Sequence, residues 1–178
     1  MAVIQQAIES VRVGRPVLLT DSPTRENEAD CIIAAELATP ELVNVVITKA
    51  RGVPCVALSS ERADALGLPV FATQFTNQFS PAFTLSVDLH AGNTTGISAQ
   101  DRSRTIQALA DPLRKVSEFV IPGHVFPIRA NPHGVLARQG HAEGAVDLHD
   151  RVPGRCERSA ELASVVRAVP MGEVLKRI

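Results

Sequence analysis

Apolar residues recur along the chain with two different spacings, one typical of helices and one typical of strands. Helical spacing, with apolar residues every three or four positions, marks five segments. Their ends carry helix signals, including Thr39-Pro40 at one start, Ser60 as the cap of another and Gly14 after the first. The expected helices are residues 2–13, 40–50, 60–68, 99–110 and a short one over 141–150.

Short apolar runs between these helices predict strands. Residues 121–130 are apolar but contain Pro122 and Pro127, which favours an edge strand or an extended segment. Residues 70–81 show no clear period and are expected to form a loop. The other expected strands are residues 16–20, 31–35, 53–59 and 82–89.

Strands and helices are therefore mixed, but without the even alternation of a doubly wound sheet. A chain of 178 residues is long enough to bury one hydrophobic core. No repeat or low-complexity linker divides it. These features predict an α+β fold in a single compact domain that spans residues 1–178.

Composition narrows the classes of partner. Hydrophobic residues make up 45% of the chain and charged residues 21%, and the formal net charge is −1. This charge gives no electrostatic reason to expect nucleic acid or an anionic membrane as a partner. The absence of Trp and Tyr makes base-stacking surfaces improbable as well. An anionic ligand would have to be small and held by local Arg side chains or backbone N–H groups.

The three cysteines are odd in number and lack a C-x-x-C spacing, so we interpret them as reduced thiols of a cytoplasmic protein. The first residues, MAVIQQAIESVRVG, do not resemble a signal peptide. No apolar run approaches the roughly 18 residues of a membrane helix.

The segment TRENEAD, residues 24–30, holds Glu26, Glu28 and Asp30 at alternate positions. In an extended segment these carboxylates would share one face and repel one another unless a cation lies among them. A solvated turn, partly neutralised by Arg25, is an equally good interpretation of the pattern alone.

Three further segments could take part in chemistry, and each also has a structural interpretation. The hydroxyls before the helix at 99–110, including that of Thr95, could meet an anion, although a capped turn is favoured. His124 lies in an apolar segment, where hydrogen-bonded core histidines are common. In RQGHAE, residues 138–143, an Arg, a Gly and a helix start could grip a phosphate, and His141 could ligate a metal. Oxygen ligands with one imidazole suit Mg²⁺ or Mn²⁺ better than structural zinc.

Four motifs, taken in order, resemble the 3,4-dihydroxy-2-butanone 4-phosphate synthase family, the lyases of riboflavin biosynthesis. RENEAD is similar to the family's RENEGD, and GVLARQGHAE to its G-V-L-x-R-x-G-H-T-E. TTGISAQDRSRT and PGHVFPIRA match two further family segments. The resemblance covers about residues 1–150 and is weaker over 151–178.

The resemblance implies an α+β domain with a mixed sheet and flanking helices, a homodimer with active sites at the interface, and a sugar-phosphate substrate. It also implies Mg²⁺ or Mn²⁺ as the cofactor. The reaction would convert D-ribulose 5-phosphate to 3,4-dihydroxy-2-butanone 4-phosphate and formate.

The resemblance also assigns residue roles by position. Glu26 and His141 would ligate the metal, and His124, Asp30 and Glu157 would be catalytic. The substrate-binding residues would be Arg25, Glu26, Asp30, Thr95, Arg138, Gln139, Gly140, His141 and Ala142.

The chain departs from the family pattern at several positions. Asp21-Ser22-Pro23-Thr24 replaces an acidic loop, and Ala142 stands where the family has Thr. Cys156-Glu157 follows His141 at a shorter distance than the family's Cys-Glu pair, so Glu161 is an alternative to Glu157. These departures leave two alternatives open: a divergent paralogue with a partial or related reaction on a sugar phosphate, and a non-catalytic homologue that pairs with an active subunit.

Overall fold

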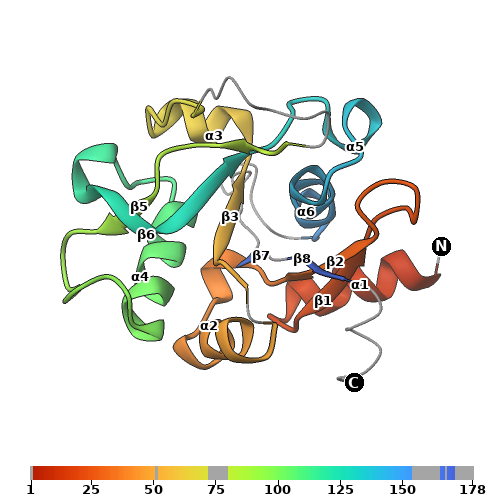
Figure 1. Cartoon of the computed structure of the whole chain (residues 1–178), viewed down its shortest axis with the longest axis horizontal. Helices are drawn as coiled ribbons and strands as arrows, with labels where there is room; N and C mark the ends of the chain where they lie inside the picture. Colours follow the sequence, from red (N-terminus) through yellow and green to blue (C-terminus); the bar gives the residue numbers. More distant parts are fainter. Residues whose placement is uncertain (1, 51, 72–79, 154–164, 167, 171–178) are drawn as a thin grey trace.

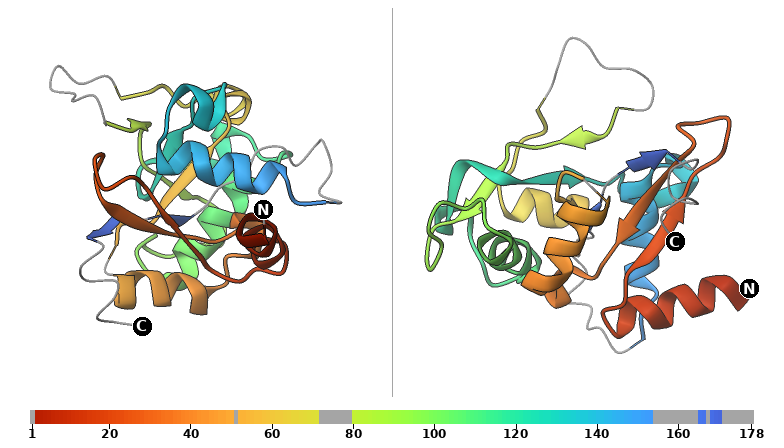
Figure 2. Two further views of the ribbon diagram at one scale, coloured as in Figure 1. Left: turned by 90° about the vertical axis from the view of Figure 1, so that its right-hand side faces the viewer. Right: turned by 60° about the horizontal axis from the view of Figure 1, so that its bottom comes forward.

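The computed structural model describes residues 2–50, 52–71, 80–153, 165–166 and 168–170. Within this part of the chain, strands form two sheets, ordered β1-β2-β8 and β4-β6-β3-β7, and β5 also pairs with β6. Helices lie on both sides of the larger sheet (Figures 1 and 2). The strands are β1 (Val17–Thr20), β2 (Glu28–Ile32), β3 (Cys55–Leu58), β4 (Ala82–Phe83), β5 (Val87–Leu89), β6 (Phe119–Arg129), β7 (Val165–Val166) and β8 (Ala168–Pro170).

Strand β3 lies at the centre of the hydrophobic core because both of its faces are covered. All four of its residues are buried, as expected for a strand between two layers of helix. Val56 and Leu58 belong to an apolar cluster that includes Ile106 and Leu109 of α4 (Ala99–Ala110). On the other face, Ala57 packs with residues of α6 (His141–Asp150). The α+β prediction, with a mixed sheet and flanking helices, is confirmed.

Most of the remaining helices follow the sequence prediction, although the short helix over Gly134–Ala137 was not predicted. The N-cap of α3 is Ser59 rather than Ser60, since the Ser59 hydroxyl accepts from the backbone N–H of Arg62. The Thr39 and Ser98 caps are present as expected. The helices are α1 (Ala2–Arg12), α2 (Pro40–Val45, continued by a π-helix over Val46–Ala50), α3 (Ser60–Ala65) and α5 (Gly134–Ala137), with short 3₁₀ segments over Ala35–Leu37 and Val116–Glu118.

Strand β6 is not an edge strand, so that part of the prediction is wrong. It pairs in parallel with β3 and antiparallel with β4 and β5. Pro122 is tolerated because it falls where a register shift separates the Val87 and Asp88 pairings with β6, at a local irregularity of the ladder.

Strand β2 begins earlier than predicted, at Glu28 instead of Cys31. Antiparallel pairing with β1 places Leu19 opposite Asp30 and Thr20 opposite Ala29, so the ladder extends into the acidic segment. The expected strand over 82–89 is instead interrupted, and it forms β4 and β5. Most of the expected loop over 70–81 lies outside the described residues.

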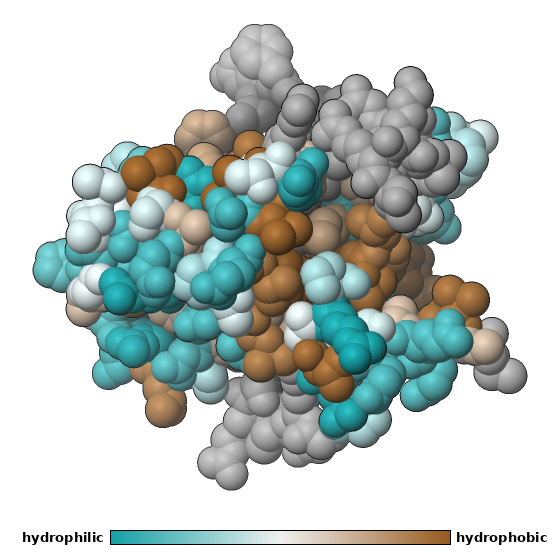
Figure 3. Space-filling model, turned by 90° about the horizontal axis from the view of Figure 1, so that it is seen from below, coloured by the Kyte–Doolittle hydropathy of each residue, from teal (hydrophilic) through white to brown (hydrophobic). Residues whose placement is uncertain are grey.

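Neither of the two described cysteines, Cys31 and Cys55, forms a disulfide. Burial, with a smaller contribution from the charge of Asp30, raises the pKa of Cys31 to about 11. His149 of α6 is buried, at 5% exposure. Seen from below the view of Figure 1, the surface carries apolar side chains in its middle with polar ones around them (Figure 3). Among the described helices, none is both long and apolar enough to span a membrane.

Arg62 of α3 is a buried cation whose hydrogen bonds connect α3 to the C-terminal end of α4. Its side chain is 1% exposed, and Nε donates to the carbonyl of Leu109 at 3.0 Å. The guanidinium also donates to the carbonyls of Asp111, Pro112 and Arg114. These acceptors lie at and just beyond the C-terminus of α4, where the helix dipole favours a positive charge.

We expect Arg62→Ala to lower the free energy of unfolding by about 3 kcal/mol or more, because buried carbonyls lose charged donors and a cavity remains. Urea denaturation followed by circular dichroism measures this. Arg12→Ala is the matched control, since Arg12 pairs with Glu9 on the surface of α1 and its loss should leave the midpoint nearly unchanged. Equal midpoints for the two variants would contradict the role of Arg62.

Candidate functional site

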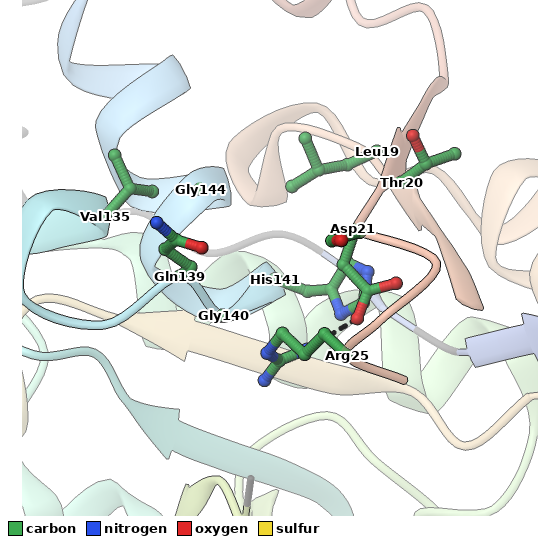
Figure 4. A pocket seen from close by; sticks show the side chains of 10 residues that line it. Leu19, Thr20, Asp21, Arg25, Val135, Gln139, Gly140, His141 and Gly144 are labelled. Atoms are coloured by element: carbon green, nitrogen blue, oxygen red, sulfur yellow. Dashed lines mark hydrogen bonds and ion pairs between the residues drawn. The ribbon is translucent and has the colours of Figure 1, made fainter. Parts of the chain in front are cut away.

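A cavity of about 230 Å³ joins two segments of the chain that lie more than a hundred residues apart. One wall comes from the end of β1 and the turn after it, and the other from the start of α6 and the residues before it (Figure 4). A Cβ on Gly144 would lie 2.8 Å from Leu19 Cδ2, so glycine allows α6 to approach β1 this closely. The lining residues are Leu19, Thr20, Asp21, Ser22, Arg25, Val135, Gln139, Gly140, His141 and Gly144.

Asp21 organises the turn between β1 and β2. Its Oδ1 accepts from the backbone N–H of Glu28 at 2.9 Å, and Oδ2 accepts from that of Glu26 at 3.0 Å. Arg25 Nη1 donates to Oδ2 at 2.8 Å. Burial acts to raise the pKa of Asp21, but these donors outweigh it, and the pKa lies below its ordinary value.

The sequence suggested that the three carboxylates of the acidic segment share one face of an extended segment. In the structure they do not. A turn over residues 23–26 reverses the chain, and Asn27, with a φ of 55° in the left-handed region, connects that turn to β2. Glu26 therefore belongs to the turn, whereas Glu28 and Asp30 belong to β2. The turn directs Glu26 toward Asp21 and His141 instead.

Asp21, Glu26 and His141 form the cluster that can hold a metal ion among the described residues. Each offers one ligand atom, and these atoms all lie within 4.8 Å of one another. His141 is 9% exposed, and its Nε2 is buried without a hydrogen-bond partner. Burial lowers the pKa of His141, which favours the neutral ring that metals bind. A divalent cation preferring oxygen ligands with one imidazole fits this donor set.

Two of these three residues, Glu26 and His141, were the predicted metal ligands, and Asp21 was missed in that role. The signal for Asp21 was present, since it is the one carboxylate in Asp21-Ser22-Pro23-Thr24 where the family has an acidic loop. Its involvement became visible only when the turn placed it beside Glu26.

Asp30 lies next to His141, on strand β2. It is 3% exposed, and its Oδ2 lies 3.6 Å from His141 Nδ1. A carboxylate at this nitrogen helps to orient the imidazole and leaves Nε2 for a ligand. Its predicted contact with a sugar stays a prediction.

Arg138 is held in place by a buried carboxylate. Its Nη1 lies 2.6 Å from Oε2 of Glu143, a side chain that is 2% exposed. The other oxygen of Glu143 accepts from the backbone N–H of Asn131 at 3.0 Å. Gly140 lies tightly against this pair, since a Cβ there would be 2.0 Å from Arg138 Nη1 and 2.3 Å from Glu143 Oε2.

Of the residues predicted to bind substrate near α6, Gln139, Gly140 and His141 line the cavity, whereas Arg138 and Ala142 do not. Ala142 is 5% exposed and packs in the apolar cluster with Ala57 and Ile128. Any contact of Ala142 with a ligand would therefore have to come from its backbone N–H at the start of α6.

His124 lines a different cavity, of about 260 Å³, together with Gly52, Val53, Pro54, Arg102, Gly123 and Phe126. Thr95 lies in the loop before α4, where Thr94 Oγ1 and the N–H of Gly96 both bond to Asp101 Oδ2. That loop is a capped turn, as favoured from the sequence. Neither His124 nor Thr95 lines the cavity of Arg25 and His141. Cys156, Glu157 and Glu161 lie outside the described residues.

Fold and site together define an α+β protein with a carboxylate–imidazole metal cluster beside Arg25. The chain belongs to the 3,4-dihydroxy-2-butanone 4-phosphate synthase family, whose model matches residues 5–170.

Relatives in other organisms agree with this assignment. The chain is 47% identical over 148 residues to the 3,4-dihydroxy-2-butanone 4-phosphate synthase of Agrobacterium fabrum, covering 83% of this chain and 70% of that protein. It is 46% identical over 147 residues to the riboflavin biosynthesis protein RibBA of a Synechocystis strain, covering 82% of this chain but 26% of that protein. The chain thus spans only part of its longer relatives.

Solved structures show the same fold. RibBX of A. baumannii, described as a two-domain 3,4-dihydroxy-2-butanone 4-phosphate synthase, superposes with a TM-score of 0.83 at 40% identity, over 93% of this chain and 47% of that one. A 3,4-dihydroxy-2-butanone 4-phosphate synthase in complex with two magnesium ions superposes with a TM-score of 0.81 at 39% identity, over 93% and 74%.

Gly140→Ala should displace the Arg138 side chain, because the added Cβ has no space between Arg138 and Glu143. We expect weaker binding of inorganic phosphate, by roughly 10-fold or more since a charge-assisted hydrogen bond is lost or misplaced. Calorimetric titration with phosphate measures this, and a parallel titration with Mg²⁺ controls for the metal cluster, which should be unaffected. Unchanged phosphate binding by the folded variant would show that Arg138 is not the anion contact.

Proposed function

We propose that this protein is a divalent-metal-dependent lyase that converts D-ribulose 5-phosphate to 3,4-dihydroxy-2-butanone 4-phosphate and formate. The observation that carries the proposal is the approach of Asp21, Glu26 and His141 to within 4.8 Å, beside Arg25 and at the start of α6. We propose Mg²⁺ or Mn²⁺ as the cation, and the cytoplasm, where thiols stay reduced, as the location.

The reaction begins by breaking a C–H bond next to a ketone, which requires a base and a means to stabilise the enediolate. A divalent cation, when bound, would supply positive charge beside adjacent substrate oxygens. Asp21, Glu26 and His141 would hold it. Asp30, next to His141, is placed to take part in proton transfer or to orient that ring.

The phosphate of the substrate would lie at the start of α6. Arg138 supplies a guanidinium, and the free N–H groups of the first helical turn add donors where the helix dipole favours an anion. Gln139 and Gly140 form the adjoining wall of the cavity. Fixing the phosphate here and the sugar oxygens at the metal orients the carbon chain between them.

We propose a homodimer in which the second catalytic histidine, His124, reaches the metal site of the other subunit. Two facts support this: His124 and the metal cluster line separate cavities, and apolar side chains are exposed around the His124 cavity. Val53, Ile97, Val120 and Ile121 are each at least 40% exposed, which favours contact with another protein surface. Thr95, which lies in the same loop as Ile97, would reach the site by the same route.

The two alternatives, a partial reaction and a non-catalytic partner subunit, are not favoured. Both were motivated by the loss of the acidic loop, but Asp21 retains a carboxylate at the position that meets Glu26 and His141. Analysis of the product by NMR distinguishes them, since the full reaction gives a four-carbon ketone and formate whereas a partial one retains all five carbons.

Glu26→Gln and His141→Ala should each reduce formate release from ribulose 5-phosphate by roughly 100-fold or more, because each removes a ligand of the cation that stabilises the transition state. Formate is measured by a coupled assay, and Mg²⁺ affinity by calorimetry. Glu9→Gln, which changes an exposed carboxylate of α1, is the control and should match the wild type. Wild-type formate release by folded Glu26→Gln protein would refute the proposed site.

Mixing two inactive variants tests the interface. Glu26→Gln removes a metal ligand from every site, and His124→Ala removes the catalytic histidine from every site. A homodimer of either variant should therefore be inactive. If sites form across a two-fold interface, random exchange of equal amounts gives half heterodimers, each with one intact site, and about a quarter of wild-type activity returns. No recovery after confirmed subunit exchange would place His124 and Glu26 of one site in the same chain.

A further inference from the structure

We propose that Asp88 is a positioning residue that fixes the tautomer and orientation of His124. The catalytic consequence rests on the function proposed above, whereas the structural assignment does not. Asp88 belongs to β5 and His124 to β6, and the two strands are paired.

The Asp88 carboxylate holds His124 at two points. Oδ1 accepts from the backbone N–H of His124 at 2.9 Å, and Oδ2 lies 2.7 Å from ring atom Nδ1. The carboxylate side chain is 12% exposed, while the imidazole is 42% exposed. A protected anchor thus holds a ring that solvent or a ligand can reach.

Two glycines provide the space that this contact needs. A Cβ on Gly96, which has a φ of 81°, would lie 2.0 Å from Asp88 Oδ2. A Cβ on Gly123 would lie 2.3 Å from the backbone nitrogen of Asp88. The pairing of β5 with β6 also shifts register between Val87 and Asp88, which sets Asp88 beside the backbone of His124. A bulge that redirects a side chain next to a cavity is a common arrangement at active sites.

The contact determines which ring nitrogen carries the proton. An ionised carboxylate can only accept hydrogen bonds, so a neutral His124 must hold its proton on Nδ1. Nε2 is then the atom with a free lone pair. His124 lines the cavity with Arg102, whose Nε is buried without a hydrogen-bond partner. An imidazole with a fixed Nδ1–H and a free Nε2 is ready to accept a proton from a ligand in this cavity.

Asp88→Asn separates this role from simple structural support. The backbone N–H of His124 can be satisfied only by an acceptor, so the amide oxygen of the Asn must face it. The amide NH₂ group must then face Nδ1, which becomes an acceptor, and the ring proton moves to Nε2. The variant therefore keeps the backbone hydrogen bond and reverses the tautomer.

The first measurement is ¹⁵N NMR of histidine side chains in the full chain, with His124 assigned by the signals lost in His124→Gln. We expect Nδ1–H in the wild type and Nε2–H in Asp88→Asn. Asp64→Asn is the matched control, because Asp64 pairs with Arg129 at the far end of β6. Its His124 signals should match the wild type. An Nε2–H tautomer in the wild-type protein would overturn the proposal without any variant.

The second measurement is formate release from ribulose 5-phosphate. We expect Asp88→Asn to lower kcat by roughly 100-fold or more with little change in KM, by analogy with replacement of the orienting aspartate in a Ser-His-Asp triad. A reversed tautomer with unchanged kcat would overturn the positioning role. If wild-type protein releases no formate, the proposed function fails, and the NMR result still decides the assignment of Asp88.

Discussion

The placement of two carboxylates, Asp21 and Glu26, around the imidazole of His141 is the constraint on which the rest of the structure depends. Like charges this close repel, and the chain offsets this by surrounding Asp21 with donors from Arg25 and two backbone N–H groups. Two of those bonds form because the turn after β1 brings the backbone of Glu26 and Glu28 back to Asp21. This turn is supported by β1 and β2, because the antiparallel pairing of the two strands keeps the ends of the turn together.

The same constraint explains how α6 is placed. His141 can reach the acidic turn only if the helix start lies close to β1, and Gly144 allows that approach. The apolar face of α6 packs on one side of β3 while α4 packs on the other. Burial of β3 therefore fixes α6, and α6 fixes both His141 and the Arg138–Glu143 pair. Core packing and the geometry of the site are parts of one arrangement.

Strand β6 connects the second group of functional residues to the same core. Its paired segment beside β3 positions Ile128 and Ala130 in the apolar cluster with α6, whereas its bulged segment carries His124 beside Asp88. Pro122 falls in the segment where the pairing with β5 shifts register. A strand that is partly regular and partly bulged thus places His124 near a cavity without loss of core packing.

The sequence by itself determined most of the helices and strands and the α+β class, and its resemblance to the family indicated Glu26 and His141 as candidate ligands. Those features depend on local spacing, capping residues and motifs, which are readable within a few positions of the chain. Only the tertiary structure decided that Asp21 joins the cluster, that Ala142 faces the core, that β6 lies inside the sheet, and that Asp88 holds His124. Each of these depends on contacts between segments far apart in sequence, or on a backbone reversal such as the turn between β1 and β2. Side-chain period alone carries no information about either.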